Sequence, residues 1–376
     1  MAGPLEGLEV VELAGLAPAP FGCMVLADLG ASVTRVDRVG GAAAVPGDVL
    51  GRGRRSIGVD LRRPEGVDLV LRLVARSDVL VEGFRPGVAE RLGIGPAQCL
   101  ARNPRLVYGR MTGWGQTGPL ADRAGHDINY IAVAGALEPI GRAGAPPTVP
   151  LNVVGDFGGG GLLLALGLLA AVYERDRSGR GQVVDAAMVD GAALLTTFLH
   201  GMSAAGAWPG GRGENLLDGG APFYDVYEAA DGKYVSVGAL EEKFYVELLA
   251  VLGLADGDVP SRHDPANWPA LRARIAAAVA TRTRDEWAAL AEGTDACLAP
   301  VLAPGEAPGY GHNAERGAFV RVGGVAQPAP APRFDRTPAD VPAPPPVVGE
   351  HTGVVLGELG LTAEEVAELR RAGVVG

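Results

Sequence analysis

Short apolar segments alternate with amphipathic ones along the first half of the chain. The apolar segments, such as residues 8–13 and 32–37, have the length and composition of β-strands. Helical signals lie between them, as at 64–74, where Pro64 occupies the first turn and apolar residues then recur on one face. This alternation predicts an α/β domain whose parallel sheet is wrapped by helices. The expected strands are 8–13, 32–37, 56–61, 78–82 and 105–108, and the expected helices are 20–29 and 64–74.

The second half of the chain has a different pattern. A polar, glycine-broken stretch from about 190 to 220 predicts a connector, and the dense prolines from 327 to 346 predict an extended polyproline-type tether. Between them, a strand signal at 233–237 is followed by amphipathic segments near 241–252, 268–280 and 286–291. We expect a large domain at 1–190, a connector at 191–222, a small α+β domain at 223–310, a proline-rich return connector at 311–346 and a C-terminal segment at 347–376.

Composition narrows the class of ligand. A chain of 376 residues with 48% hydrophobic side chains can bury the cores of about two domains. The net charge of -11 argues against non-specific nucleic-acid binding, which requires a basic surface. We therefore expect a small-molecule ligand and no nucleic-acid partner.

Cysteine and histidine usage suggests neither a disulfide framework nor a metal site. The isolated Cys23, Cys99 and Cys297 form no paired motif, which favours a reducing compartment. Four of the five histidines, at positions 200, 263, 312 and 351, lack the spacing of metal ligands. We expect no metal.

No targeting or membrane segment is evident in the sequence. The N-terminal residues lack both a basic region and a long apolar region, so no signal peptide is expected. The most apolar segment, 162–173, is roughly half of the ~20 residues that a membrane span requires. We expect it to be a buried core helix, in a protein that is cytoplasmic and has no membrane partner.

Two glycine-containing turns exclude familiar nucleotide-binding motifs. The turn after the first strand, 14–20, lacks the G-x-G-x-x-G spacing of a nicotinamide-binding unit, so a dehydrogenase is rejected. The four glycines at 158–161 are not followed by Gly-Lys-Ser/Thr and form no P-loop.

Arginines recur near the ends of the predicted strands. Strand ends are where an open α/β sheet binds its ligand, and guanidinium groups bind phosphates well. The repetition favours a nucleotide-phosphate ligand, although any one of these side chains could equally be a solvated surface residue. The arginines in question are Arg38, Arg52, Arg54, Arg55, Arg62, Arg85 and Arg91.

His126 and Asp156 are the strongest candidates for chemistry. Each is flanked by glycine, which predicts an exposed loop. An imidazole and a carboxylate that face one carbon from opposite sides could remove a proton from one face and return it to the other, as in a two-base isomerase. The alternative from the residues alone is that Asp156 caps a turn and His126 has no special role.

Several longer motifs, in order along the chain, resemble the family III CoA-transferases (CaiB/BaiF type) and, within them, the α-methylacyl-CoA racemases. These motifs lie at residues 7–13, 26–31, 54–61, 78–87, 112–119 and 349–352. The resemblance implies a Rossmann-like large domain that the C-terminal segment completes, a small α+β domain and an interlocked homodimer. It also implies an acyl-CoA substrate and no separate cofactor, because CoA is part of the substrate.

The resemblance also assigns roles to individual residues. His126 and Asp156 fall on the two bases of the racemases, and Glu241 falls on a residue paired with that histidine, in the same subunit or in the partner. The positions that fall on CoA or substrate contacts are Arg38, Val59, Asp60, Leu61, Arg62, Gly83, Phe84, Arg85, Arg91, Gly125, Asp127, Ile128, Asn129 and Tyr130.

The implied reaction is racemisation of 2-methyl-branched acyl-CoA thioesters by two-base 1,1-proton transfer. A hydrogen α to a thioester is weakly acidic, so the enolate needs stabilising donors as well as a base. We expect a helix that begins at Gly158–Gly161 behind Asp156 to offer such N–H groups. The alternatives are a CoA-transferase that forms an acyl anhydride at Asp156, or a non-catalytic CoA-binding protein. The acyl group is not identified by the sequence.

Overall fold

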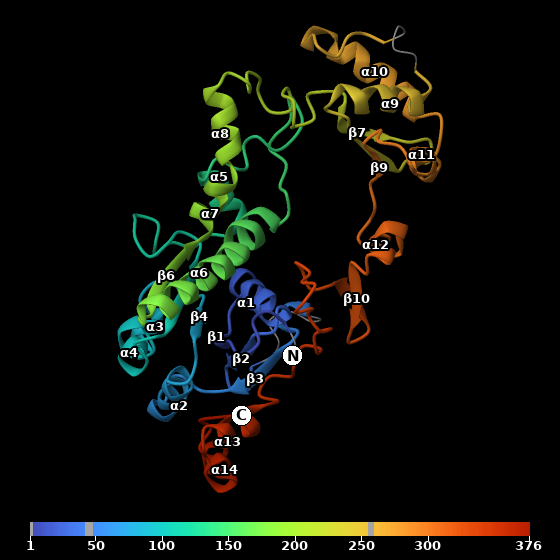
Figure 1. Ribbon diagram of the computed structural model, residues 1–376. Coiled ribbons are helices and arrows are strands. Elements are labelled where there is room, and N and C mark those ends of the chain that lie inside the picture. Colours follow the sequence, from blue (N-terminus) through green and yellow to red (C-terminus); the bar gives the residue numbers. More distant parts are fainter. Residues whose placement is uncertain (1–2, 42–47, 255–258) are drawn as a thin grey trace. The chain divides into compact units, whose positions relative to one another are not determined.

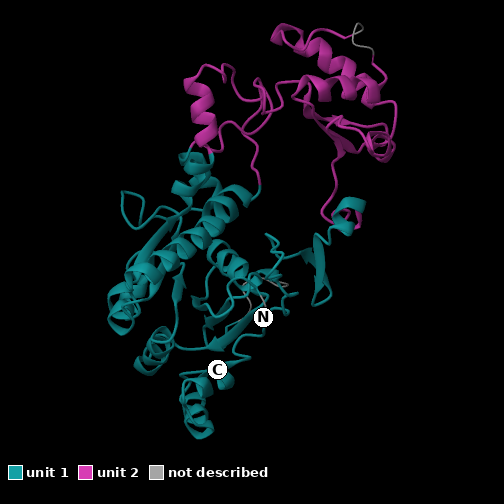
Figure 2. Cartoon of the chain, viewed as in Figure 1, with its two compact units in different colours: residues 1–134, 151–195, 311–376 teal, residues 135–150, 196–310 magenta. Residues whose placement is uncertain are grey.

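The computed structural model describes residues 3–41, 48–254 and 259–376 and divides them into two compact units. Unit 1 comprises residues 1–134, 151–195 and 311–376, and unit 2 comprises 135–150 and 196–310 (Figure 2). Each unit has its own hydrophobic core, so each is described by itself.

A parallel sheet forms the centre of unit 1 (Figure 1). The strand order is β3-β2-β1-β4-β5-β6, and β1 pairs with both β2 and β4. The chain order therefore reverses between β1 and β4, which is the switch point where Rossmann-like sheets bind ligands. The strands are β1 Glu9–Leu13, β2 Ser32–Asp37, β3 Arg54–Gly58, β4 Val79–Glu82, β5 Val107–Thr112 and β6 Gln182–Ala187.

Helices cover both faces of this sheet, as the alternating pattern predicts. On one face, Leu26 of α1 (Pro18–Asp28) packs in a core with Leu164 and Leu168 of α6 (Leu163–Ser178). On the other face lie α2 (Pro64–Val74), α4 (Pro96–Arg102), α13 (Thr352–Glu358) and α14 (Ala363–Arg371). The unit also contains α3 (Val88–Arg91), α5 (Asp127–Val133), α7 (Met188–Leu195) and the short η1 (Val49–Gly51).

The C-terminal segment docks on β3 through the 349–352 motif. The backbone N–H of Ser56 donates to Nδ1 of His351 at 3.2 Å, and the N–H of Gly58 donates to Oγ1 of Thr352 at 3.0 Å. Val355 and Leu356 are buried in the core beside Ile57. The motif therefore joins the C-terminal segment to β3.

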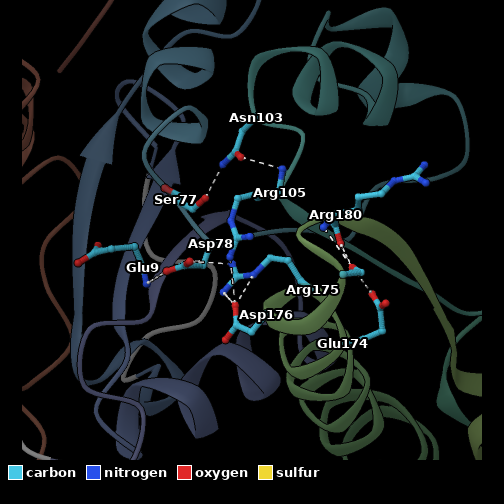
Figure 3. A network of polar contacts seen from close by, with 10 residues as sticks. Glu9, Ser77, Asp78, Asn103, Arg105, Glu174, Arg175, Asp176 and Arg180 are labelled. Carbon is cyan, nitrogen blue, oxygen red and sulfur yellow. Dashed lines mark hydrogen bonds and ion pairs between the residues drawn. The ribbon is translucent and has the colours of Figure 1, made fainter.

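At the amino end of the sheet, a polar network ties α6 to β4 (Figure 3). Asp78 accepts the backbone N–H of Glu9 at 2.9 Å and a hydrogen bond from Nη1 of Arg175 at 2.7 Å. Asn103 donates to the carbonyl oxygen of Ser77 at 2.7 Å. The network therefore ties the segment directly before β4 to β1, to α6 and to the turn before β5.

The apolar segment at 162–173 is a core helix as predicted on one face only, because its other face is exposed. It is part of a continuous helical run of 26 residues, Val153–Ser178, which starts as the π-helix η2 (Val153–Leu162) and continues as α6. By length and composition this run could cross a membrane. Leu164 is fully buried, but Leu166 is 62% exposed and Tyr173 is 69% exposed. The difference arises because overall apolarity does not reveal which face of a helix packs inside its own chain.

Unit 2 contains a small antiparallel sheet in the order β7-β8-β9, covered by helices. Trp287, Leu248 and Ile275 are fully buried between the sheet and the helices. The elements are β7 Tyr224–Glu228, β8 Tyr234–Gly238, β9 Leu298–Pro300, α8 Thr197–Ala204, α9 Glu242–Leu252, α10 Trp268–Val279 and α11 Arg284–Ala291, with the short η4 Pro265–Asn267 and η5 Ala307–Gly309.

The expected boundary of the large domain at 1–190 is wrong for residues 135–150, which cluster with unit 2. Arg142 pairs with the buried Asp225, and Arg212 pairs with Glu138 at 3.1 Å, so these residues are held by partners distant in sequence. The expected connector at 191–222 likewise contains the end of α7 and all of α8.

The return connector is also more structured than the prolines predict. Residues 311–346 belong to unit 1 and include α12 (Gly311–Glu315) and a hairpin of β10 (Phe319–Val322) and β11 (Val325–Pro328). Arg52 donates to Gln327 at 3.0 Å and to the carbonyl oxygen of Pro328 at 2.9 Å, which anchors the hairpin. Downstream of the hairpin, residues 329–346 of this connector contain no helix or strand.

Candidate active site

A cavity of about 780 Å³ opens in unit 1 at the carboxyl ends of β1, β4 and β5. It lies beside the switch point between β1 and β4, the position at which such sheets bind ligands. The lining includes Ala14–Pro20, Asp48, Leu50, Gly83–Pro86, Met111–Trp114, Ala121, Arg123–His126, Tyr130, Asn152, Asp156, Phe157 and Met188. Both predicted bases are therefore in one cavity.

His126 is exposed because it caps the amino end of α5 and points outside the helix. Its backbone N–H donates to Oδ1 of Asn129 at 3.1 Å. The preceding Gly125 is fixed by Tyr130, whose hydroxyl donates to the Gly125 carbonyl oxygen and whose ring packs edge-on against Trp114 at 4.8 Å. A Cβ at Gly125 would lie 2.7 Å from the Tyr130 ring, so glycine permits this close packing.

Asp156 lies in the first turn of η2, which corrects the expectation of a loop. Nδ2 of Asn152 donates to its Oδ2 at 3.0 Å, and its backbone N–H donates to Oδ2 of Asp127 at 2.7 Å. Burial raises the pKa of Asp156, and the negative charge of Asp127 raises it further. The hydrogen bond from Asn152 and the nearby His126 act in the opposite direction. Asp156 is therefore a half-buried carboxyl group that holds a proton more readily than an exposed aspartate.

The four glycines after Asp156 have a packing role, which corrects their expected role as a helix start with free N–H groups. The helical run begins at Val153, so these glycines lie beyond its first residues. A Cβ at Gly159 would lie 2.6 Å from the backbone nitrogen of Ala192 in α7, and a Cβ at Gly161 would lie 2.6 Å from the carbonyl oxygen of Pro18 in α1. Glycine here lets η2 pack closely between α1 and α7.

The loop that follows β4 is held by buried charges. Glu82, fully buried at the end of β4, accepts the backbone N–H of Phe84 at 2.7 Å and Nε of Arg110 at 2.9 Å. Arg110 also donates to Glu90 of α3 at 2.8 Å. Burial raises the pKa of Glu82. This chain of contacts fixes Gly83–Arg85, which line the cavity.

The other predicted CoA contacts lie at the same edge of the sheet but outside this cavity. Arg38 follows β2, the stretch 59–62 follows β3, and Arg91 ends α3. Arg38, Arg85 and Arg91 are exposed and, among the residues that the structure describes, are in no salt bridge. Arg62 pairs with Asp60 at 2.9 Å, and Val59 and Leu61 pack towards the core.

Arg52, Arg54 and Arg55 are not phosphate ligands of the expected kind, because each pairs with a carboxylate, the first two inside the fold and Arg55 at the surface. Arg52 pairs with Asp28, Arg54 with the fully buried Glu12 and Arg55 with Glu358. They also precede or begin β3, which starts at Arg54 and not at the predicted residue 56. Their partners are distant in sequence, so strand-end position alone could not reveal them.

The remaining predicted residues are distributed differently. Ile128 and Asn129 are exposed on α5, and Asp127 is buried beneath His126. Glu241 belongs to unit 2 and occupies the N-cap position of α9. Burial raises the pKa of the Cys297 thiol, and the negative charge of Glu241 raises it further. Cys297 lines a second cavity, of about 560 Å³, within unit 2.

Sequence reasoning missed Asn152 and Phe157, which also line the cavity. Asn152 precedes Asp156 by four residues, and that spacing would have placed the two side chains together had the segment been read as helical. The ring of Phe157 packs against that of Phe21, with the ring centroids 4.7 Å apart. These aromatic residues carried no signal because apolar residues near a predicted core are expected anyway.

Comparison with known proteins shows the family to which this chain is similar. Residues 5–352 match the model of CoA-transferase family III. The chain is 49% identical over 374 residues to the α-methylacyl-CoA racemase of Mus musculus, covering 99% of this chain and 97% of that protein. It is 47% identical over 368 residues to the racemase of the same name from Homo sapiens, covering 97% and 96%.

Solved structures agree with the fold. A CAIB/BAIF family protein from Brucella suis aligns with a TM-score of 0.82 at 27% identity, covering 96% of this chain and 100% of that one. The orthorhombic form of Rv3272 from M. tuberculosis aligns with a TM-score of 0.76 at 30% identity, covering 94% and 99%.

Proposed function

This chain belongs to the family III CoA-transferases, and we propose that within this family it is a racemase of 2-methyl-branched acyl-CoA thioesters. The observation that carries the proposal is that His126 and Asp156 line one cavity at the switch point of the sheet. Two relatives that match nearly the whole chain are named α-methylacyl-CoA racemases. The reaction is an isomerisation in which one base removes the α-hydrogen and the other returns a proton to the opposite face.

The two bases can take complementary roles in this proton transfer. Asp156 holds a proton more readily than an exposed aspartate, because burial and the charge of Asp127 raise its pKa. His126 is exposed at the rim of the same cavity and can accept the α-proton. The enolate formed between them requires hydrogen-bond donors. The backbone N–H of Asp127, the first residue of α5, has no acceptor within its own helix and is our candidate donor.

Isotope exchange tests the proposed reaction directly. A single epimer of a 2-methylacyl-CoA, incubated in deuterated water, should lose its configuration and gain deuterium at the α-carbon at matching rates. A panel of branched fatty acyl, bile-acid-type and aryl-propionyl thioesters would identify the acyl group. Retention of configuration without deuterium uptake across the whole panel would contradict the proposal.

A CoA-transferase is the second candidate, and the family match favours it independently. In that reaction Asp156 attacks the thioester carbonyl, CoA leaves, and an acyl anhydride forms on the carboxylate. His126 distinguishes the two activities, because transfer needs no second base. The variant His126→Ala should lose racemisation and keep any exchange of labelled CoA into a free acid.

We propose that the CoA moiety lies across the carboxyl edge of the sheet. Arg38, Arg85 and Arg91 are exposed at this edge, and the Glu82–Arg110 contacts fix the loop that carries Arg85. Arg38→Ala and Arg91→Ala should weaken CoA binding mainly through lost phosphate contacts, with a smaller loss at high salt. CoA is part of the substrate, and no separate cofactor or metal is proposed.

We also propose that the active form is an interlocked homodimer in which Glu241 acts beside the His126 of the other copy. Exposed apolar side chains on the 153–178 helix, including Leu162, Leu166 and Tyr173, support a protein interface. Mixing inactive His126→Ala and Glu241→Ala chains should restore partial activity, because one of the mixed sites would be intact. A fully active monomer at high dilution would contradict this arrangement. A cytoplasmic location without a membrane or nucleic-acid partner stays a prediction.

A further inference from the structure

Asp127 is a buried carboxylate that joins the two segments bearing the candidate bases. It is 6% exposed and is the first residue of α5, directly after His126. Its Oδ2 accepts the backbone N–H of Asp156 at 2.7 Å. One side chain therefore links the start of α5 to the first turn of η2.

The surroundings of Asp127 are built for this contact. A Cβ at Gly155 would lie 2.5 Å from Oδ2 of Asp127 and 2.8 Å from its Cγ, so only glycine leaves room for the carboxylate. Its other oxygen, Oδ1, is buried and has no hydrogen-bond partner among the described residues. A buried carboxylate with one oxygen unpaired destabilises the folded state, so its presence calls for an explanation.

We propose that the Asp127 side chain is a positioning residue, which holds the backbone of Asp156 in register with His126 and places a fixed negative charge beside the Asp156 carboxyl group. This inference rests on the proposed function, since it concerns the same two bases. It assigns to the side chain a role separate from the backbone N–H of Asp127, which is the candidate donor to the enolate.

The charge and the contact should have separable effects. Two negative charges close together oppose each other, so Asp127 favours the protonated form of Asp156. The other groups that act on Asp156 are Asn152 and His126, and both lower its pKa. The Asp156 carboxylate in turn helps burial to raise the pKa of Tyr130, whereas Arg85 lowers the pKa of Tyr130. Removing the charge alone should lower the pKa of Asp156, whereas removing the contact should misplace the base.

Three variants separate these effects. Asp127→Asn keeps an oxygen that accepts the Asp156 N–H but removes the charge. Asp127→Ala removes both. Gly155→Ala keeps the charge and forces the carboxylate away from Asp156. The matched control is Asp122→Asn, which neutralises an exposed acid in the loop before α5.

The expected kinetic results follow from geometry. Asp127→Ala and Gly155→Ala should lose kcat by about 100-fold with little change in KM, because a small misplacement of a catalytic group costs about that much. Asp127→Asn keeps the contact but not the charge, so its kcat should lie between those of Asp127→Ala and the wild type. Asp156 acts as the base for the epimer whose α-hydrogen faces it. With that epimer, the acidic limb of the pH profile of kcat/KM should move to lower pH in Asp127→Asn. Asp122→Asn should match the wild type in each measurement.

A titration that needs no activity distinguishes this inference from the proposed function. In protein labelled with ¹³C at aspartate carboxyl groups, the Asp156 signal is assigned by its loss in Asp156→Asn. Its midpoint should move to lower pH in Asp127→Asn and stay in place in Asp122→Asn. If the midpoint moves but no thioester is racemised, the reaction is wrong and the positioning role stands.

Two results would overturn the positioning role. One is an unchanged Asp156 midpoint in folded Asp127→Asn. The other is wild-type kcat in folded Asp127→Ala and Gly155→Ala. A merely structural role would lower thermal stability in these variants without changing the titration of Asp156.

Discussion

The amino and carboxyl ends of the same parallel sheet differ in how their polar side chains are paired. At the amino end, both oxygens of Asp78 are hydrogen-bonded, one by Arg175 of α6 and one by the backbone of Glu9 (Figure 3). At the carboxyl end, Oδ1 of Asp127 and Nε1 of Trp114 are buried without a partner among the described residues. Arg85 is exposed there. Asp78 is therefore fully paired at the amino end, whereas two buried polar atoms near the carboxyl end have no protein partner among the described residues.

This contrast arises from how parallel strands meet their connections. Ligand-binding loops follow the carboxyl ends of the strands, and the switch point between β1 and β4 separates two of these loops. At the amino ends of the strands the chain returns from the helices. Ion pairs there can hold these connections to the sheet. Substitutions at the two ends should therefore affect different properties.

The largest expected effect is on catalysis at the carboxyl end. His126→Ala should lower racemisation by about 10²–10⁴-fold, the usual contribution of a general base. The measurement is deuterium uptake at the α-carbon of a single epimer. The control is His312→Ala, which removes an exposed histidine of the same unit and should leave the rate unchanged. Equal rates for His126→Ala and the wild type would remove His126 from the mechanism.

The next effect concerns stability at the amino end. Arg175→Leu should lower the free energy of unfolding by about 2 kcal/mol, because Asp78 loses a charged hydrogen-bond donor. Asp78 is partly exposed, so solvent moderates the loss. Chemical denaturation would measure the stability, and kcat should stay at the wild-type value. A fall in kcat in a fully folded variant would break the separation between the two ends.

A smaller effect is expected at the support of the CoA-side loop. Glu82→Ala removes the acceptor of the Phe84 N–H, so the loop at 83–85 should lose order and CoA should bind about tenfold more weakly, or about 1.4 kcal/mol. Glu82→Gln keeps an acceptor oxygen and should bind CoA more tightly than Glu82→Ala. Calorimetric titration with CoA measures both variants. Equal affinities in all three proteins would show that this loop does not depend on Glu82.

The smallest effect is the pH dependence of stability at Asp156. Its folded pKa is raised, so the folded state binds more protons than the unfolded state as pH rises through this range. The wild type should therefore lose stability between the ordinary aspartate pKa and the raised value. Asp156→Asn removes this loss and should gain stability relative to the wild type as pH rises from acid to neutral. Thermal unfolding across pH measures the difference, and a constant difference at every pH would contradict the raised pKa.

The candidate site illustrates what sequence could predict. His126 and Asp156 stood out because of flanking glycines and a family resemblance, and the structure brings both into one cavity. The residues that hold them were not predictable. Asp127 reaches Asp156 across 29 positions in sequence, and Arg110 reaches Glu82 across 28. Spacing rules describe neighbours on one element and are silent about partners on another.

The sequence by itself determined the local features of this protein. Apolar periodicity predicted five of the six strands of the parallel sheet and the helices α9, α10 and α11 of unit 2, and the order of strand and helix signals predicted the parallel sheet. These features depend on contacts that recur within a few residues, so they can be read locally.

Only the tertiary structure decided which polar groups were committed and which were free. Arg52, Arg54 and Arg85 look alike in sequence, yet the first two are buried against Asp28 and Glu12 and the third is exposed beside the cavity. Likewise, the pKa of Asp156 is raised because burial and the negative charge of Asp127 outweigh the hydrogen bond from Asn152. The physical reason is that desolvation and pairing depend on atoms brought together from distant parts of the chain.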